Sequence, residues 1–269
     1  EAAGAHVETG RHTEAFVEGS ALVVLSPGVE DASLPVTWAI ARKIPLMGEM
    51  ELGYRFCKGR IIGITGTNGK STVTTLIGEI LQAGGKDTVV CGNIGNSLCG
   101  EIDRITDRTW VVLEVSSFQL EKIEYFCPHI ALILNITDDH MDRYARFDEY
   151  VAAKLKIFAH QASDDHLILN ADAPNLRPLV KQARSRVSWY SRLEKVDGAY
   201  LRGQDLVSSA SGSAETVASL SDMRLKGVHN VENVLACILA GTLAGVPAAA
   251  MRRAIQGFTG LHHRVELVG

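Results

Sequence analysis

A glycine-rich stretch, GITGTNGKST at residues 63–72, constrains the fold more than any other part of the sequence. The run before it, Arg60–Thr65, is apolar enough to read as a buried strand, and apolar residues recur at helical spacing from Val73 to Leu81. A glycine-rich turn between a strand and a helix exposes backbone N–H groups, and the helix N-terminus adds a partial positive charge. The stretch therefore predicts an anion-binding loop.

The loop departs from the commonest nucleotide-binding pattern, G-x-x-x-x-G-K-[ST], because Ile64 stands where the first glycine belongs. Lys70 and Ser71 nevertheless hold the places from which a lysine reaches the β- and γ-phosphates and a hydroxyl ligates Mg²⁺. An ordinary turn followed by a capped helix is the alternative. The strand before the loop and the helix after it favour a nucleotide phosphate.

Short apolar runs alternate with helical periods along the chain, which predicts an α/β fold with a mostly parallel sheet flanked by helices. A further helix is expected where apolar residues recur from Val231 to Leu239. The polar segment Ser208–Ser219 is expected to be an exposed loop or hairpin without chemistry. The other expected strands are Ala21–Ser26, Thr109–Val115, Ile130–Ile136 and His166–Ala171.

Composition narrows the class of protein. The 27 Lys and Arg residues against 31 Asp and Glu residues give a net charge of −4, which argues against nucleic-acid binding. The five cysteines show no C-x-x-C spacing, as expected of a reduced cytoplasmic protein. The apolar stretch Val234–Met251 approaches spanning length, but Pro247 interrupts it. We expect two packed helices there, with Pro247 in the first turn of the second, and no membrane span.

Polar residues follow two of the expected strands, where ligands of open α/β sheets bind. Glu114 lies inside an apolar strand, which is costly for an unpaired carboxylate, so we interpret it as a metal ligand. His140 either caps a turn or belongs to the same site. Lys154 on its own reads as a surface lysine, and Asn230 fits a helix cap as well as a ligand contact.

Seven segments resemble the Mur ligase family and occur in its order, covering roughly residues 21–267. They are GITGTNGKSTVTTLIGEIL, GNIGNSL, VLEVSSFQLE, ILNITDDHMDRY, YVAAKLKIF, GVHNVENVLAC and FTGLHHRVE. SSFQLE and DHMDRY are most similar to the D-glutamate-adding member. The resemblance implies a P-loop-type central ATPase domain preceded by a partial Rossmann-like N-terminal domain.

The resemblance also implies a reaction. Such ligases phosphorylate a substrate carboxylate with ATP, and the amine of an incoming amino acid attacks the acyl phosphate to give an amide. The implied substrates are UDP-N-acetylmuramoyl-L-alanine and D-glutamate, in the synthesis of peptidoglycan precursors. The implied cofactors are ATP and two Mg²⁺ ions, with Lys154 as a carbamate made with CO₂, because a carbamate supplies the anionic oxygen that Mg²⁺ prefers.

Site residues follow from the same resemblance. Catalysis would fall to Lys70, Glu114, His140 and Lys154, and the metal ligands would be Ser71, Glu114, His140 and Lys154. The substrate would contact Ser26, Gly28, Asn93, Ser116 and Gln119. ATP would contact Gly66, Thr67, Asn68, Gly69, Lys70, Ser71, Thr72, Asn230, Asn233 and Arg264.

The resemblance divides the chain into three parts. Residues 1–48 match the end of the UDP-binding domain, residues 49–260 the ATP-binding domain, and residues 261–269 a hinge and the start of a C-terminal domain. Because the C-terminal domain supplies the amino-acid site, we expect a monomer that binds nucleotide but does not ligate. Alternatives are a sister ligase adding another amino acid, or glutamate to a folate, a regulatory NTPase, and a non-catalytic binding module.

Overall fold

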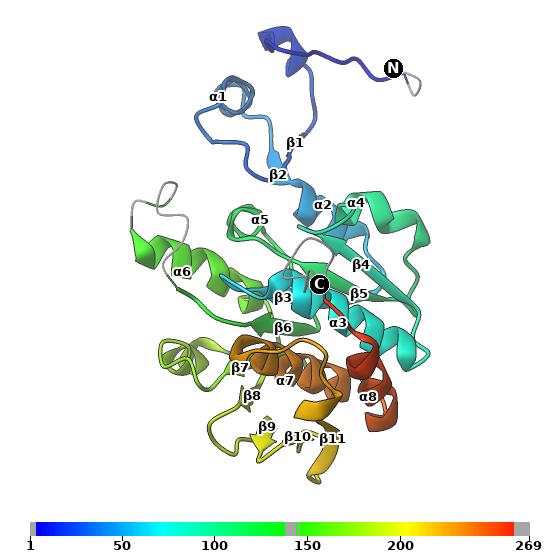
Figure 1. Cartoon of the computed structure of the whole chain (residues 1–269). Helices are drawn as coiled ribbons and strands as arrows, with labels where there is room; N and C mark the ends of the chain where they lie inside the picture. Colours follow the sequence, from blue (N-terminus) through cyan, green and yellow to red (C-terminus); the bar gives the residue numbers. More distant parts are fainter. Residues whose placement is uncertain (1–3, 138–143, 145, 261–269) are drawn as a thin grey trace, which may run out of the picture.

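A nine-stranded sheet forms the centre of the molecule in the computed structural model, which describes residues 4–137, 144 and 146–260 (Figure 1). The strand order is β11-β10-β9-β8-β7-β6-β3-β5-β4. Neighbouring strands from β9 to β4 run parallel, and β10 and β11 are antiparallel additions at one edge. The strands are β3 (Arg60–Thr65), β4 (Thr88–Gly92), β5 (Trp110–Glu114), β6 (Ile130–Ile133), β7 (His166–Asn170), β8 (Arg186–Ser191), β9 (Gly198–Arg202), β10 (Asp205–Ser208) and β11 (Glu215–Ser219).

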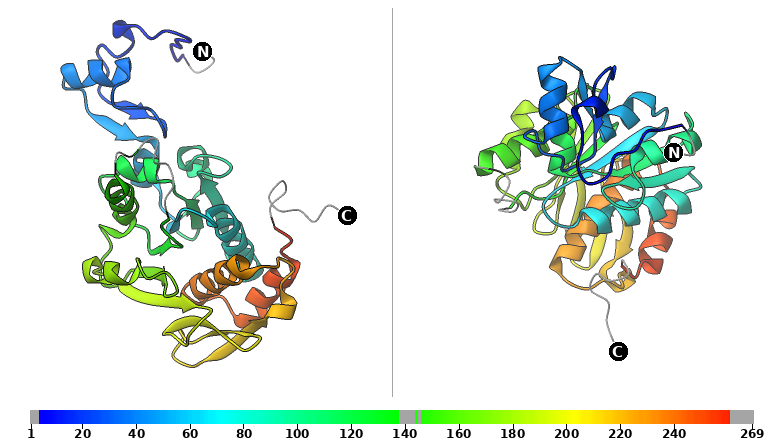
Figure 2. Two further views of the ribbon diagram at one scale, coloured as in Figure 1. Left: turned by 60° about the vertical axis from the view of Figure 1, so that its left-hand side comes forward. Right: turned by 90° about the horizontal axis from the view of Figure 1, so that it is seen from above.

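Helices cover both faces of this sheet (Figure 2). Helices α3 (Lys70–Ala83), α7 (Val228–Leu243) and α8 (Ala248–Gly257) share one hydrophobic cluster with the strands. The opposite cluster takes α2 (Glu49–Phe56), α4 (Leu98–Glu101), α5 (Ser117–Glu121) and α6 (Phe147–Leu155). The short 3₁₀ helices are η1 (Glu14–Phe16), η2 (Ile102–Arg104), η3 (Lys156–Phe158), η4 (Arg177–Gln182) and η5 (Leu220–Asp222).

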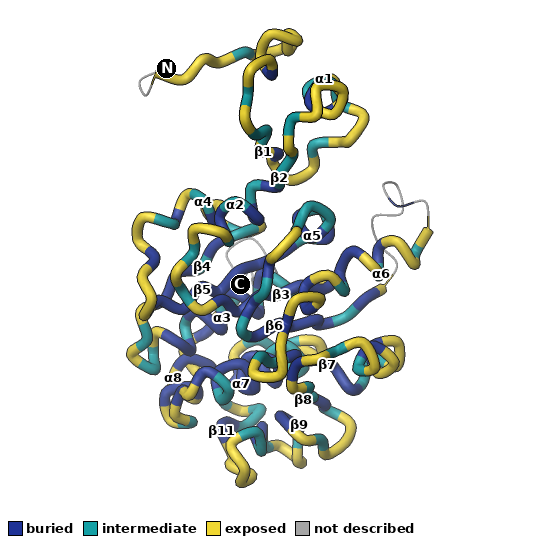
Figure 3. Tube along the Cα trace, turned by 180° about the vertical axis from the view of Figure 1, so that it is seen from behind, coloured by how far each residue is buried: buried dark blue, intermediate teal, exposed yellow. Residues whose placement is uncertain are grey.

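The central strands are buried on both sides, because successive side chains of a strand point to opposite faces. Val112 packs with α3 and α7, whereas Val111 and Leu113 pack with α2 and α5, and all three are fully buried. The buried core runs through the middle of the sheet in Figure 3. Near-continuous apolar strands are thus explained by a parallel sheet covered by helices, as the sequence predicted.

A smaller unit precedes the sheet. Strand β1 (Val23–Leu25) pairs in parallel with β2 (Leu46–Gly48), and α1 (Leu34–Ala41) crosses between them. Gly48 ends β2 and is also the N-cap of α2, so the unit joins the first helix of the larger part without an intervening loop. Figure 1 shows it projecting beyond the end of the sheet that carries α2, α4 and α5.

All five expected strands are confirmed in place, with ends one to three residues shorter in every case except β3. The hairpin expected near residues 208–219 is confirmed, but its second arm is not exposed: Val217 and Ala218 are buried in the cluster that contains α8. The two helices expected in this stretch are present, but Pro247, which was expected in the first turn of the second, is instead the N-cap of α8, so that helix begins one residue later. Within the described residues, no helix combines the length and apolarity needed to cross a membrane.

Candidate active site

The loop between β3 and α3 depends on glycine at two positions. Gly66 and Gly69 have φ angles of 155° and 87°, which side chains rarely adopt. A Cβ at Gly69 would lie 2.6 Å from Oδ1 of Asn233, and one at Gly66 would lie 3.1 Å from Cβ of Leu134. The loop is therefore packed against the residues that follow β6 on one side and against α7 on the other, which leaves no room for side chains at these two positions.

Asn135, just beyond the end of β6, holds the loop in shape. Its side-chain Oδ1 accepts from the Asn68 amide at 2.8 Å, and its Nδ2 donates to the Asn68 carbonyl at 3.1 Å. Its own carbonyl accepts from the Thr67 amide at 3.0 Å. The Thr67 and Asn68 amides are therefore committed to Asn135, and the anion-binding end begins at Gly69, where α3 presents its N-terminus.

Lys70 folds back over the loop. Its Nζ donates to the carbonyls of Gly66 and Thr67 at 2.9 and 2.8 Å. The ammonium is thereby held at the mouth of the loop, where the sequence predicted a charge for the terminal phosphates. Ser71 follows it in the first turn of α3 and is buried.

Glu114 ends β5 next to the loop, because β3 and β5 are neighbours and Ile64 pairs with Glu114. The side chain is 2% exposed. Oε1 accepts from Nδ2 of Asn93 at 2.9 Å, and Oε2 is buried with no hydrogen-bond partner among the residues that the structure describes. Asn93, expected to touch the substrate, thus contacts this carboxylate in the structure.

A buried carboxylate oxygen without a partner is costly, and a cation is the group that would satisfy it. Mg²⁺ is commonly held by one or two carboxylates together with substrate phosphates and waters, so the Glu114 carboxylate next to the loop fits this ion. Among the described residues, no three His, Cys, Asp or Glu side chains gather into a metal-binding group. His140, another of the four expected ligands, lies outside the described residues.

Lys154 is not the surface lysine that its position alone predicted: it is 2% exposed. It lies on α6, and its Nζ donates to the Gly66 carbonyl at 3.0 Å. The same atom lies 4.5 Å from the ring centroid of Tyr150, one turn earlier on the helix. The Tyr150 hydroxyl in turn lies 3.1 Å from Oγ1 of Thr67, so α6 touches the loop through two side chains.

The N-terminus of α7 closes the other side of the loop. Asn233 meets Gly69, and its Nδ2 lies 3.4 Å from Oδ1 of Asn230. Asn230 does not cap the helix: the N-cap is Gly227, and Nδ2 of Asn230 donates back to the Lys226 carbonyl at 2.9 Å. The capping alternative for Asn230 is therefore wrong.

A hollow of about 480 Å³ opens between the loop, the ends of β6 and β7, and α7. Its walls also include Arg192 and Glu232, which form an ion pair. A hollow that begins at an anion-binding loop and continues between polar walls can accept a nucleotide. Its lining residues are Asn68, Gly69, Asn135, Thr137, Asn170, Asp172, Ala173, Arg192, His229, Glu232 and Asn233.

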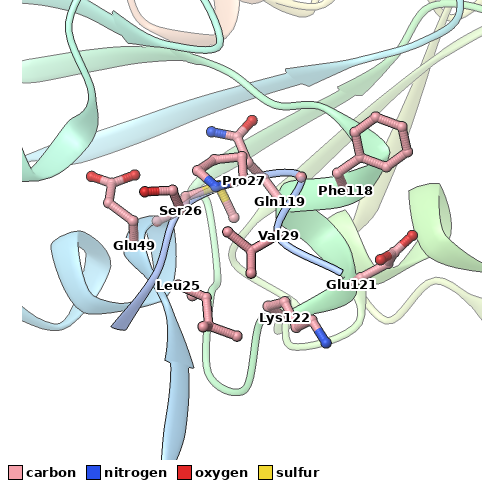
Figure 4. A pocket seen from close by; sticks show the side chains of 12 residues that line it. Leu25, Ser26, Pro27, Val29, Glu49, Phe118, Gln119, Glu121 and Lys122 are labelled. Atoms are coloured by element: carbon pink, nitrogen blue, oxygen red, sulfur yellow. The ribbon is translucent and has the colours of Figure 1, made fainter. Parts of the chain in front are cut away.

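Three of the expected substrate residues, Ser26, Gly28 and Gln119, meet at the junction of the small unit and α5. The turn after β1, with Ser26 and Gly28, faces Gln119 and Lys122 across a cavity of about 10 Å³, the space of roughly one water molecule (Figure 4). Ser116 and Gln119 form a capping box at the start of α5. These two side chains therefore stabilise a helix end in addition to any contact with a ligand.

Several residues of the site were not singled out from the sequence. Asn135 follows a strand at the same edge as Glu114, and the strand-end argument applied to Glu114 could have found it. Tyr150 shares a helix face with Lys154, a spacing visible in the sequence. Tyr190 donates to the Leu134 carbonyl at 3.1 Å, and complete burial raises the pKa of its phenol. Arg264, the last expected phosphate contact, lies outside the described residues.

Comparison with known proteins places this site in a family. The pattern of the Mur ligase middle domain matches residues 64–241, which contain the loop, Glu114, Lys154 and most of α7. Among solved structures, a UDP-N-acetylmuramoyl-L-alanyl-D-glutamate–2,6-diaminopimelate ligase has a TM-score of 0.66 at 21% identity, covering 89% of this chain and 60% of that one. The UDP-N-acetylmuramate–alanine ligase of Thermotoga maritima has a TM-score of 0.61 at 21% identity, covering 94% and 58%.

Curated relatives are closer in sequence. The UDP-N-acetylmuramoylalanine–D-glutamate ligase of Koribacter versatilis is 44% identical over 264 residues, and that of Pelotomaculum thermopropionicum is 40% identical over 268. The alignments cover 98% and 99% of this chain but only 58% and 59% of the relatives, so the chain spans less than three fifths of their length. The match over residues 64–241 covers the site and most of the central sheet, and the chain belongs to the Mur ligase family.

Proposed function

We propose that this chain provides the ATP-binding part of a ligase that joins D-glutamate to UDP-N-acetylmuramoyl-L-alanine in the synthesis of peptidoglycan precursors. The observation that carries the proposal is the pairing of Ile64 with Glu114, which sets beside the phosphate loop a buried carboxylate, one oxygen of which has no partner in the described part of the chain. Both curated relatives described above bear the name of this ligase, which supports the choice of substrates.

The nucleotide is proposed to lie with its phosphates on the loop and its nucleoside in the adjoining hollow. Gly66 to Thr72 would surround the triphosphate, and the Lys70 ammonium would move from its two carbonyl acceptors to the terminal phosphates. Asn230 and Asn233 would contact the nucleoside side, and Arg264 would reach the phosphates from the hinge. The substrate carboxylate attacks the γ-phosphate, ADP leaves, and the amine of the amino acid displaces phosphate from the acyl phosphate.

Two Mg²⁺ ions are proposed, which when bound would offset negative charge on the phosphoryl oxygens. Glu114 and Ser71 would hold one, and His140 with a carbamylated Lys154 would hold the second. A carbamate keeps one N–H on the lysine nitrogen, so the hydrogen bond from Lys154 to the Gly66 carbonyl is compatible with the modification. A carbon-13 carbamate signal that appears with labelled bicarbonate and is lost in Lys154→Met would test this.

Ser26 and Gly28 are proposed to contact the UDP end of the acceptor, and Asn93, Ser116 and Gln119 its muramoyl-alanine end. Residues 1–48, 49–260 and 261–269 are proposed as parts of three successive domains, in a monomeric cytoplasmic protein. Because the amino-acid site would lie in the last domain, the 269 residues alone are expected to bind nucleotide without ligating. Amide formation by these residues alone would overturn this domain assignment.

The test is phosphate release by the full-length natural protein with ATP, Mg²⁺ and UDP-N-acetylmuramoyl-L-alanine across a panel of amino acids. Release that requires D-glutamate supports the proposal. Release with another amino acid assigns a sister ligase, and release indifferent to both substrates assigns an NTPase. Lys70→Met should abolish release, whereas Lys195→Met, at an exposed lysine, is the matched control and should not change it.

A further inference from the structure

A buried carboxylate on α2 holds the chain that leaves α5. Glu51 is 1% exposed, and its Oε1 accepts from Nε of Arg55 and from the Tyr125 amide, each at 3.1 Å. Its Oε2 accepts from three successive backbone amides at 3.0, 3.2 and 3.2 Å, those of Glu124, Tyr125 and Phe126. None of the roles proposed above uses this side chain.

The segment held in this way lies between two elements. It runs from the end of α5 at Glu121 to the start of β6 at Ile130 and belongs to neither a helix nor a strand, so its amides need partners from elsewhere in the chain. Successive amides that converge on one carboxylate form an anion site, and such charge-assisted hydrogen bonds are stronger than neutral ones. The position of this segment therefore depends on the carboxylate of Glu51.

Helix α5 is attached at both of its ends. At its start, Ser116 and Gln119 form the capping box described above. After its end, Lys122 packs against Gly48, and the first amide bound by Glu51 follows two residues later. A helix of 5 residues is too short to be stable alone, so these two attachments set the direction of α5.

The same carboxylate connects the two walls of the cavity between the small unit and α5. Gln119 and Lys122 line this cavity on one side, and the turn after β1 lines it on the other (Figure 4). Gly48, three residues before Glu51, ends β2, which pairs with β1. The stretch 48–51 thus reaches one wall through the β1–β2 pair and the other through the amides that Glu51 binds.

We propose that Glu51 is a positioning residue for the acceptor: by fixing the segment 122–126, it sets the distance between Gln119 and the turn of Ser26 and Gly28. This inference rests on the proposed function, which assigns UDP-N-acetylmuramoyl-L-alanine to these residues. In the described part of the chain, the hydrogen bonds of Glu51 come from Arg55 and the segment and none from the phosphate loop, so ATP binding should not depend on it.

The experiment compares Glu51→Gln with the natural full-length protein in ligation assays with ATP, D-glutamate and UDP-N-acetylmuramoyl-L-alanine. Both oxygens of Glu51 face N–H donors, so either orientation of a glutamine amide would set its own donors against them. KM for UDP-N-acetylmuramoyl-L-alanine should rise about tenfold or more, because bonds to a buried carboxylate are lost, whereas kcat and KM for ATP should stay within about twofold.

Arg55→Met is the matched control. Arg55 lies on the same helix and also reaches the segment, through an ion pair with Glu124 and with its Cζ 4.8 Å from the ring centroid of Tyr125. Its removal leaves the amide bonds to Glu51 in place, so KM for the acceptor should stay within about twofold. A rise as large as that in Glu51→Gln would overturn the inference, as would equal rises in KM for the acceptor and for ATP in Glu51→Gln.

Hydrogen exchange in the natural full-length protein tests the same role without a substitution. The amides of Glu124, Tyr125 and Phe126 should exchange about tenfold more slowly with UDP-N-acetylmuramoyl-L-alanine bound, and at an unchanged rate with ADP alone. A rate that the acceptor does not change would overturn the inference. If the natural protein does not bind this acceptor, the proposed function fails together with the inference. If it ligates D-glutamate but Glu51→Gln keeps the natural KM for the acceptor, the inference alone fails.

Discussion

Asn135 and Asn68 exchange two hydrogen bonds, from the Asn68 amide to Oδ1 and from Nδ2 to the Asn68 carbonyl. The Asn135 side-chain amide thus bonds both backbone polar groups of Asn68, as a neighbouring strand would do in a sheet. The shape of the phosphate loop consequently depends on a residue of a different strand, far away in the sequence.

Replacing Asn135 by Ala should remove both bonds while keeping the backbone bond from Thr67. We expect a loss of about 1–2 kcal/mol in the free energy of unfolding, since two hydrogen bonds are lost at a half-buried position. ADP affinity should fall further, by about tenfold, because the loop loses its fixed shape. Urea unfolding and calorimetry would measure the two effects, and an ADP affinity that stays the same would contradict this role.

Substitution of Gly69 by Ala should destabilise the protein by about 2–4 kcal/mol, because the new Cβ combines a positive φ with a contact of 2.6 Å to Asn233. Gly85→Ala is the matched control: its φ is 73°, but no atom lies within 4 Å of the added Cβ. Its cost should be that of the backbone conformation alone, about 1 kcal/mol. Equal losses in the two variants, measured by urea unfolding, would show that Asn233 yields to the added methyl group.

Glu114→Gln should separate stability from metal use. The substitution removes a buried charge and can preserve the contact with Asn93, so the free energy of unfolding without Mg²⁺ should stay the same or rise. Phosphate release by the full-length protein should fall at least a hundredfold, because the proposed metal ligand is lost. Thermal unfolding and a Mg²⁺ titration would check both parts. Release close to that of the natural protein would remove Glu114 from the metal site.

His166 is the first residue of β7, at the end of the strand away from the phosphate loop, and it makes the stability of the protein depend on pH. Burial lowers the pKa of its imidazole below the ordinary value of 6.5, and neighbouring His129 and Arg186 lower it further. Above pH 6.5 the imidazole is neutral in both the folded and the unfolded chain, so it does not change the free energy of unfolding. As the pH falls from 6.5 toward the folded pKa, the unfolded chain binds more protons and stability is lost.

The measurement is the urea midpoint at pH 8 and pH 5 for His166→Gln beside His160→Gln, a substitution at an exposed histidine. The natural protein should lose stability between the two pH values, and His166→Gln should lose less. The His160 variant should follow the natural protein. A loss of stability in His166→Gln as large as that of the natural protein would assign the pH dependence to other groups.

The sequence predicted the central architecture because β3, β5, β6 and β7 are apolar on both faces, a pattern that few other folds produce. Strands β8 to β11 were harder to predict from the sequence, because they lie toward one edge of the sheet and carry polar residues such as Arg186, Ser188 and Asp205. β4 was missed as well, although its run TVVCG is short and apolar. Edge strands need one buried face only, so their pattern is weak.

Some residues of the candidate site could be predicted from the sequence and others could not. Gly66, Lys70 and Glu114 could be found because each departs from the pattern around it, a glycine run or a charge in an apolar strand. Lys154 and Asn230 could not be placed from pattern alone, because burial and capping are decided by contacts between distant segments. The Arg192–Glu232 pair joins residues 40 positions apart, and nothing local in either segment marks it.

Gly48 ties the small N-terminal unit directly to this site. A Cβ at Gly48 would lie 2.9 Å from Cβ of Lys122, so the chain crosses from β2 into α2 in contact with the residue that follows α5. The ion pair between Lys122 and Asp31 adds a second attachment between the same two parts. A change in the orientation of the N-terminal unit would therefore be passed through Gly48 and Lys122 to α5. Helix α5 begins at Ser117, three residues after Glu114.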